Sequence, residues 1–172
     1  MAKPTISLCM IAKNEENNLA NCINSVKEIV DEIIIVDTGS ADKTKEIAKK
    51  FSDMRVSSRT RSQLTAKVYD FNWIDDFSAA RNESIKHAAK DWILILDADE
   101  VLEDAGLKTI KDLINDKEND AFLFLQKNYT NDASVAGFVN EGHKKDGKVY
   151  AGWYGSLIAR LFRNKKGYCF EG

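Results

Sequence analysis

The sequence predicts an α/β fold in which a mainly parallel sheet is flanked by helices, with a smaller antiparallel part toward the C-terminus. Apolar runs at residues 6–11, 32–37 and 92–96 have the length of buried strands. The first two runs are followed by segments with helical spacing of apolar residues, and this alternation is typical of parallel sheets with right-handed crossovers. After Asp116 the alternation stops, and strand-like runs are separated by polar, glycine-containing segments.

Length, charge and cysteine content exclude several classes of protein. The 172 residues suffice for one domain with a sizeable core, so we treat 1–172 as a single domain. The net charge of −2 provides no basic field that would attract nucleic acid. No apolar run approaches the roughly 18 residues of a membrane-spanning helix, and Met1–Pro4 leads into a strand-like run rather than a signal peptide. Cys9, Cys22 and Cys169 match neither a zinc pattern nor a disulfide framework, so we expect reduced thiols in a cytoplasmic protein.

The elements of the first half follow from periodicity and from turn residues. Apolar residues at helical spacing predict a helix over 19–28, and Ser40 or Asp42 can cap a second helix that ends near residue 51. The polar segment 52–67 is expected to be a long loop with a short strand near residues 54–56. A strand at 68–71 precedes a third helix over 77–89, in which we expect the following side chains to be buried: Phe77, Ala80, Ile85 and Ala88.

The second half is predicted from weaker patterns. A fourth helix is expected over 105–114 and a strand over 121–125, followed by a polar stretch at 128–150 that offers little periodic order. A loosely alternating strand at 156–163, a turn, and a return strand at 168–170 predict a hairpin. An exposed apolar hairpin can pair with another chain, so a homodimer formed through this segment is expected.

Carboxylates cluster at the predicted ends of two strands. Asp37 follows the second strand, and Asp97-Ala98-Asp99 follows the strand at 92–96. The carboxyl ends of parallel strands meet at one edge of a sheet, where open α/β folds bind ligands. Two close carboxylates are costly unless a cation neutralises them, and a divalent ion shared with phosphates is the natural candidate. The competing interpretations are a solvated acidic turn for the triplet and a helix cap for Asp37.

Four segments together resemble family 2 glycosyltransferases with the GT-A fold. They are residues 6–16, 35–44, 73–82 and 96–100, and they occur in the family's order. The resemblance is closest over residues 5–115 and most resembles a bacterial subgroup of small glycosyltransferases that carry a Trp…Asp-Phe…Ala-Arg-Asn segment.

The resemblance implies a donor and a metal site. The chain is expected to transfer a sugar, with inversion, from a nucleoside-diphosphate sugar of the UDP type to an acceptor that is a glycan, a lipid or a protein. Asp99 would bind Mn²⁺ or Mg²⁺, while Asp97 would hold ribose or reach the metal through water. The other residues expected to bind the nucleotide sugar are Ala12, Asn14, Glu15, Asp37, Gly39, Ser40, Arg81 and Ala98. The alternative for Arg81 is a surface ion pair with Asp75 or Asp76.

The acceptor half is less well defined. The resemblance implies a nucleotide-sugar half over about 1–115 and an acceptor-side half over about 116–172. The protein is expected in the cytoplasm, at the inner face of the membrane. Similar proteins continue to a His-Glu pair beyond Gly172, so the chain is expected to be a fragment. An inverting transfer needs a carboxylate general base, and the candidates are Asp132, Glu141 and Glu171.

Three other functions compete with this one. Asp97 followed by Asp99 and Val101 also fits the nucleophile motif of haloacid-dehalogenase-like phosphatases, in which the first Asp attacks phosphate. That motif normally lies on the first strand, whereas here two strand–helix units precede it. A sugar nucleotidyltransferase would need a glycine-rich loop after the first strand, and residues 12–16 contain no glycine. A catalytically incomplete fragment that binds nucleotide sugar is the third alternative.

Overall fold

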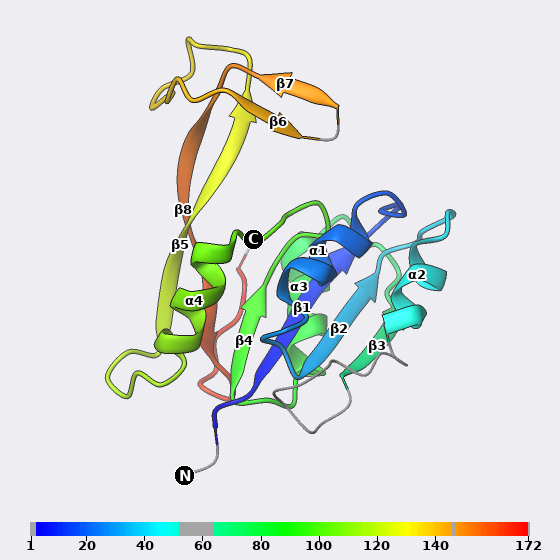
Figure 1. Ribbon diagram of the computed structural model, residues 1–172. Helices are drawn as coiled ribbons and strands as arrows, with labels where there is room; N and C mark the ends of the chain where they lie inside the picture. The colour runs from blue at the N-terminus through cyan, green and yellow to red at the C-terminus, as the bar shows by residue number, and fades with distance from the viewer. Residues whose placement is uncertain (1–2, 52–63, 146, 172) are drawn as a thin grey trace. The chain divides into compact units, whose positions relative to one another are not determined.

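The computed structural model describes residues 3–51, 64–145 and 147–171. Six strands form one sheet in the order β3-β2-β1-β4-β8-β5, and β6 pairs with β7 in a second sheet (Figure 1). The strands are β1 Ile6–Ala12, β2 Glu32–Asp37, β3 Thr65–Asp70, β4 Trp92–Ile95, β5 Ala121–Thr130, β6 His143–Lys145, β7 Lys148–Tyr150 and β8 Gly152–Arg163. The helices are α1 Leu19–Val26, α2 Thr44–Lys50, α3 Phe77–Lys86 and α4 Asp104–Leu113. The chain divides into two compact units, Met1–Asp120 with Phe162–Gly172, and Ala121–Leu161.

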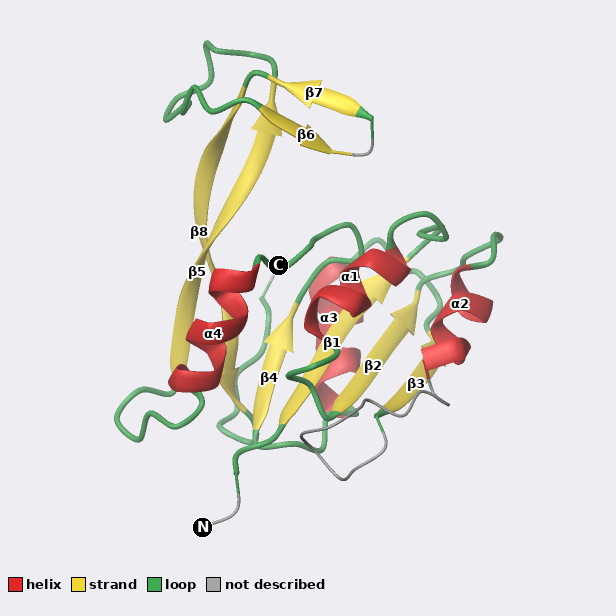
Figure 2. Cartoon of the chain, in the orientation of Figure 1, coloured by secondary structure: helices red, strands yellow, loops and turns green. Residues whose placement is uncertain are grey.

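The first unit is built on four parallel strands. β1 pairs with both β2 and β4, and β2 pairs with β3, all in parallel. The chain moves in one direction across the sheet from β1 to β3 and then returns to β4 on the other side of β1. Right-handed crossovers therefore place α1 and α2 on one face and α3 on the opposite face, as Figures 1 and 2 show.

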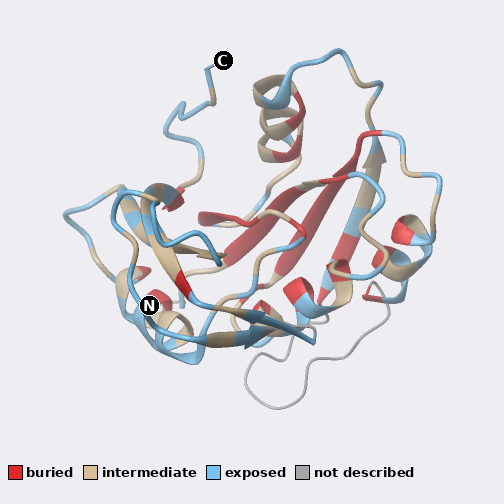
Figure 3. Cartoon of the chain, turned by 90° about the horizontal axis from the view of Figure 1, so that it is seen from above, coloured by how far each residue is buried: buried red, intermediate tan, exposed pale blue. Residues whose placement is uncertain are grey.

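The parallel strands β1, β2 and β4 form the core because both of their faces are covered. Every residue of β2 and β4 is buried, which explains why β4 and the residues between Glu32 and Asp37 of β2 are apolar (Figure 3). On one face, Cys9, Ile34 and Phe162 belong to a buried cluster against which Ile85 and Phe170 pack. Phe162 is the residue at which β8 enters the first unit.

A buried carboxylate lies at the amino end of the sheet. Glu32 is 2% exposed, and its carboxylate accepts hydrogen bonds from Ser7 Oγ at 2.8 Å, Ala89 N at 2.9 Å and Lys67 Nζ at 3.0 Å. Burial raises the pKa of Glu32, but the hydrogen bonds from Ala89, Ser7 and Lys67 outweigh it and hold the pKa below its ordinary value. The ionised form therefore stabilises the folded state.

Replacing Glu32 with glutamine is expected to lower the free energy of unfolding by about 1–3 kcal/mol at pH 7. Because the folded-state pKa is depressed, the contribution of the carboxylate is complete above its unfolded pKa of about 4.3 and disappears as the pH falls through the folded-state value. Urea unfolding at several pH values should show the difference between wild type and Glu32→Gln shrinking below about pH 4. A difference that stays constant down to pH 3 would contradict this account.

The second unit is ordered by aromatic and amide contacts. Tyr129 stacks on His143 with ring centroids 4.1 Å apart, and the side chain of Asn131 bonds Val149 O at 3.2 Å and Ala151 N at 2.7 Å. The segment 128–150 therefore contains the end of β5 and the β6–β7 pair, although its sequence offers little periodicity. Pairwise stacking and side-chain-to-backbone bonds of this kind leave no helical or strand repeat in the sequence.

Several other expectations are corrected. Tyr168–Phe170 forms no strand, so the hairpin on which the homodimer prediction rested is absent. Phe77 is 61% exposed rather than buried, and it packs edge-to-face on Trp73 at 4.8 Å. The third strand begins at Thr65, within the expected loop, and the expected strand at 54–56 lies outside the described residues. No helix within the described residues is both long and apolar enough to span a membrane.

Candidate functional site

The carboxyl ends of the parallel strands bring two predicted site segments together. Strand register places Ala12 beside Asp37 and Asp37 beside Asp70. The loop after β1 is then joined to the loop after β2, because Asn14 N donates to Ser40 Oγ at 2.9 Å and Asn14 Oδ1 accepts from Ala41 N at 2.8 Å. Asn14 has a positive φ of 58°, a conformation that asparagine tolerates better than most residues. Its side-chain oxygen therefore links the loop after β1 to the loop after β2.

Asp37 is held at the end of β2 by hydrogen bonds to only one of its two carboxylate oxygens. Its Oδ1 accepts from Gly39 N at 3.1 Å and Ser40 N at 2.9 Å, and Gly39 turns the chain with a φ of 105°. Lys45 Nζ lies 3.9 Å from Oδ1 and 2.8 Å from Asp70 Oδ1. Among the described residues, Asp37 Oδ2 is the one buried side-chain oxygen or nitrogen that lacks a hydrogen-bond partner. Such an atom is costly unless a water or a ligand satisfies it.

The turn after β4 fixes the position of Asp97. Asp97 N donates to Glu100 Oε2 at 2.9 Å, and Glu100 N donates to Asp97 O at 3.0 Å. The Cys22 thiol of α1 also donates to Asp97 O at 3.5 Å. No role is predicted for Glu100 from the sequence, although its position three residues after Asp97 is the spacing of a reciprocal capping pair. Cys22 carried no sequence signal, because its contact depends on how α1 packs against this turn.

Arg81 of α3 bonds to the predicted metal motif. Its Nη2 lies 2.9 Å from Asp97 Oδ1, with side-chain exposures of 27% for Arg81 and 32% for Asp97. The alternative pairing with Asp75 or Asp76 is wrong, because Asp76 instead caps α3 by accepting from Ala79 N at 2.9 Å. A guanidinium and a carboxylate thus meet where the sequence predicted a phosphate site and a metal site.

The arrangement fits a metal ion only together with a bound ligand. Within the described residues, no group of three or more His, Cys, Asp or Glu side chains is arranged to hold a metal. Asp97 is half-buried and Asp99 is exposed, two residues apart on the turn after β4. Mg²⁺ is commonly bound by one or two carboxylates and substrate phosphates. The two aspartates therefore fit a divalent ion that shares its coordination with a diphosphate.

The three candidate bases have different surroundings. Glu141 is an exposed residue of the second unit, and its Oε2 accepts from Trp153 Nε1 at 2.8 Å. Asp132, in the same unit, accepts from Ser134 Oγ and N, and these bonds lower its pKa. A lowered pKa makes a weaker general base. Glu171 belongs to the first unit and follows Phe170, whose ring lies under Arg81.

The chain has relatives among known proteins. A family model described as glycosyl transferase family 2 matches residues 7–166. A TPR repeat-containing protein of Synechococcus elongatus is 40% identical over 170 residues, which cover 99% of this chain and 34% of that protein. The SPbeta prophage-derived glycosyltransferase SunS of Bacillus subtilis is 38% identical over 97 residues, which cover 56% of this chain and 20% of SunS. The chain thus spans about a third of the first relative and a fifth of the second.

Solved structures share the fold. TarS of S. aureus in complex with UDP superimposes with a TM-score of 0.60 at 20% identity, covering 80% of this chain and 40% of that one. The mannosyltransferase PcManGT of Pyrobaculum calidifontis, in complex with GDP-Man and Mn²⁺, gives 0.57 at 18% identity, covering 71% and 35%. The family match over nearly the whole chain favours the glycosyltransferase interpretation over the phosphatase and nucleotidyltransferase alternatives. The chain belongs to glycosyl transferase family 2.

Proposed function

We propose that this domain binds a UDP-sugar together with Mn²⁺ or Mg²⁺ and transfers the sugar, with inversion, to an acceptor that is a glycan, a lipid or a protein. The observation that carries the proposal is the Arg81–Asp97 contact of 2.9 Å beside Asp99, at the carboxyl edge of a parallel sheet. Cationic and anionic side chains are both needed where a diphosphate and a metal ion bind together. Support also comes from fold neighbours that were solved with UDP-GlcNAc, or with GDP-Man and Mn²⁺.

The nucleoside would bind between the loops after β1 and β2. The unpartnered Oδ2 of Asp37 is an acceptor for an N–H of the base or a hydroxyl of the ribose. Ala12, Asn14 and Glu15 form the facing wall, and Gly39 and Ser40 hold Asp37 in place through their backbone N–H groups. Because Gly39 has no side chain, the turn leaves its surface open to a ligand.

The diphosphate would bind beside Asp97, Ala98 and Asp99. Asp99, the more exposed carboxylate, would hold the metal, with Asp97 as its neighbour; when bound, the ion would act as a Lewis acid that neutralises the leaving diphosphate. Arg81 can donate to a phosphate oxygen from nitrogens that Asp97 does not engage, because guanidinium carries five N–H groups. Arg81 would thus orient the diphosphate while Asp97 keeps the guanidinium in place.

For the acceptor side, we propose Glu171 as the general base. Glu171 is exposed, and it adjoins Phe170, which contacts Arg81 within the same compact unit. The roles of Asp132 and Glu141 stay predictions, as do a cytoplasmic location near the inner face of a membrane and a homodimer.

Titration calorimetry of the 172-residue chain with UDP tests the donor site. We expect binding in the presence of MnCl₂ or MgCl₂ and at least about tenfold weaker binding in EDTA, because Asp97 and Asp99 repel a bare diphosphate. Release of inorganic phosphate from sugar phosphates would instead support the phosphatase alternative. Equal UDP binding with and without metal, or none by the folded chain, would overturn the metal-diphosphate assignment.

A further inference from the structure

The segment 168–171, which has no regular secondary structure, is hydrogen-bonded to α3 through the side chain of Asn82. Asn82 Oδ1 accepts a hydrogen bond from Phe170 N at 2.8 Å, and Asn82 Nδ2 donates one to Phe170 O at 2.9 Å. Both polar atoms of the Asn82 amide therefore bond to the backbone N–H and C=O of Phe170, as the backbone of a residue in a neighbouring β-strand would. This clamp fixes where the Phe170 side chain begins.

The Phe170 ring connects the core of the first unit to Arg81. One contact is with the buried cluster that contains Cys9, Ile34 and Phe162. The other is with Arg81, whose guanidinium carbon lies 5.5 Å from the ring centroid. A cation over an aromatic face is attracted to the ring and loses rotational freedom there.

Arg81 needs such support because its ion pair with Asp97 is partly exposed. A half-exposed pair gains little in water, since the flexible arginine must be held in one geometry. Here the guanidinium has the Phe170 ring as one neighbour and Asp97 Oδ1 as the other, 2.9 Å from Nη2. The ring therefore limits the positions from which Arg81 can reach Asp97.

We propose that Asn82 and Phe170 are positioning residues of the donor site: Asn82 holds Phe170, and the Phe170 ring holds Arg81 in place against Asp97 and, through it, against the diphosphate. The inference rests on the proposed function for the ligand, while the positioning of Arg81 is a property of the folded chain. Under this proposal the segment 168–171 belongs to the donor site, although Phe170 itself does not bind the ligand.

The test compares a variant of Phe170 that removes the aromatic face with one that keeps it. Calorimetry with UDP and MnCl₂ should give a Kd about fivefold higher for Phe170→Leu, and a Kd within about twofold of wild type for Phe170→Tyr, which restores a π face. Asn82→Ala should weaken UDP binding to a similar degree. If the role of Phe170 were merely structural, the Phe170→Leu variant, whose leucine fills the same site in the core, would bind UDP as well as the Phe170→Tyr variant does. That result would overturn the proposal.

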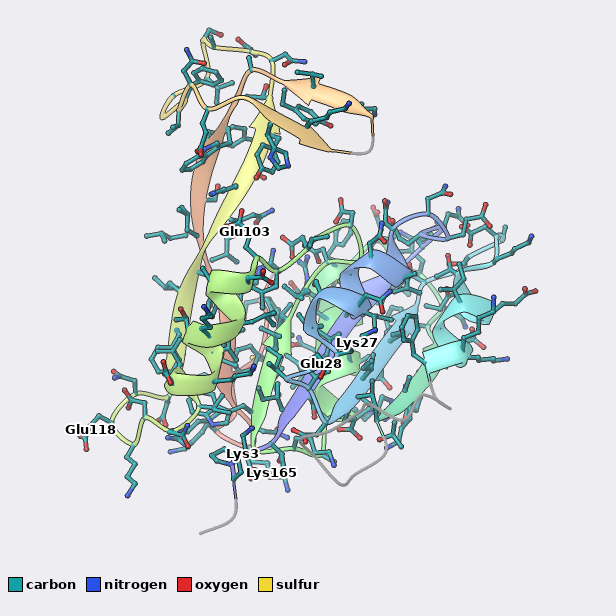
Figure 4. All side chains as sticks on the ribbon, in the orientation of Figure 1. Lys3, Lys27, Glu28, Glu103, Glu118 and Lys165 are labelled. Carbon is teal, nitrogen blue, oxygen red and sulfur yellow. The ribbon has the colours of Figure 1, made fainter. Side chains whose placement is uncertain are left out.

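Asn164 offers a matched control. Its side-chain amide also clamps backbone groups, Ala88 O at 3.0 Å and Lys90 O at 2.8 Å. It lies at the amino-terminal end of β4, where Lys165 is drawn in Figure 4, and its own N–H bonds Asp91 O. Asn164→Ala should lower thermal stability as Asn82→Ala does and leave the Kd for UDP unchanged. A loss of UDP affinity in both variants would show that any lost clamp has this effect, and would overturn the specific role of Asn82.

A measurement without ligand separates this inference from the proposed function. In urea unfolding, Phe170→Leu and Asp97→Ala, which removes the acceptor of the Arg81 hydrogen bond, should be non-additive by a factor of about two or more in the unfolding equilibrium constant. That coupling should vanish in an Arg81→Met background, since Arg81 transmits it. If wild type binds no UDP, the proposed function fails, but this double-mutant cycle still tests whether Phe170 positions Arg81. Additive effects, or coupling that survives Arg81→Met, would overturn the inference.

Discussion

Asp99→Asn is expected to remove the effect of Mn²⁺ on UDP binding. The described residues provide no cluster of three metal-binding side chains, so the protein's share of the coordination rests on very few atoms. Losing a residue that only hydrogen-bonds to a metal ligand typically costs 10–100-fold in metal affinity. Losing Asp99, the exposed carboxylate that would contact the ion directly, should therefore cost at least about 100-fold. Calorimetric titration of UDP at a series of MnCl₂ concentrations measures the change.

Two further variants make the result specific. Asp97→Asn should weaken metal-dependent UDP binding less than Asp99→Asn does, because its amide oxygen can still accept from Arg81. Asp104→Asn, at the exposed first turn of α4, changes the net charge equally and should leave the titration as in wild type. If Asp99→Asn retained a wild-type response to Mn²⁺, Asp99 would not be a metal ligand.

The largest loss of stability is expected from Trp92→Ala at the start of β4. Trp92 is fully buried; its Nε1 donates to Ile114 O at 3.1 Å, and the Arg163 guanidinium lies 4.5 Å from its ring centroid. Truncating the ring would leave a large cavity, an unpaired carbonyl and an arginine without its aromatic neighbour. The free energy of unfolding should fall by about 3–5 kcal/mol in urea titrations.

Two tryptophan variants separate the contributions. Trp92→Phe keeps most of the ring volume but cannot donate to Ile114 O, so a smaller loss of about 1–3 kcal/mol is expected. Trp73→Ala removes a half-exposed ring whose ring contact is an edge-to-face one with exposed Phe77, and should cost less than either. A cost at Trp73 equal to that at Trp92 would refute the view that burial determines these losses.

The parallel strands β1, β2 and β4 were predictable because burial on both faces leaves a simple signature. The run from Glu32 to Asp37 was predicted with the bounds that β2 has, and β1 and β4 differ from their predicted bounds by one residue each. Their order in the sheet follows the right-handed crossover rule, which acts on local connections. A continuous apolar run needs no information from distant parts of the chain.

The errors occur where tertiary contacts replace regular hydrogen bonding. Tyr168–Phe170 has the composition of a strand, yet the backbone groups of Phe170 bond to the Asn82 side chain, 88 residues away. Phe77 stands at a helical position that suits burial, but it starts α3 at an exposed end and packs on Trp73. Neither partner can be found from periodicity, because a single side-chain contact has no period.

The predicted site divides in the same way. The strand-end carboxylates Asp37, Asp97 and Asp99 are recognisable because acidic residues directly follow apolar runs. The unpartnered state of Asp37 Oδ2 and the pairing of Arg81 with Asp97 depend on distances across the sheet edge and were not derivable from spacing. Arg81 was predicted as a phosphate ligand, and the structure adds the carboxylate that holds it.

By itself, the sequence determined the family, the parallel sheet and the edge of that sheet where the acidic residues gather. These follow from hydrophobic runs and from residues adjacent in the chain, which act over a few positions. Only the tertiary structure decided which atoms meet at that edge: Arg81 with Asp97, Asn82 with Phe170, and the Cys22 thiol with the turn at Asp97. Such contacts join segments between 16 and 88 residues apart, and their geometry exists only after the core has brought those segments together.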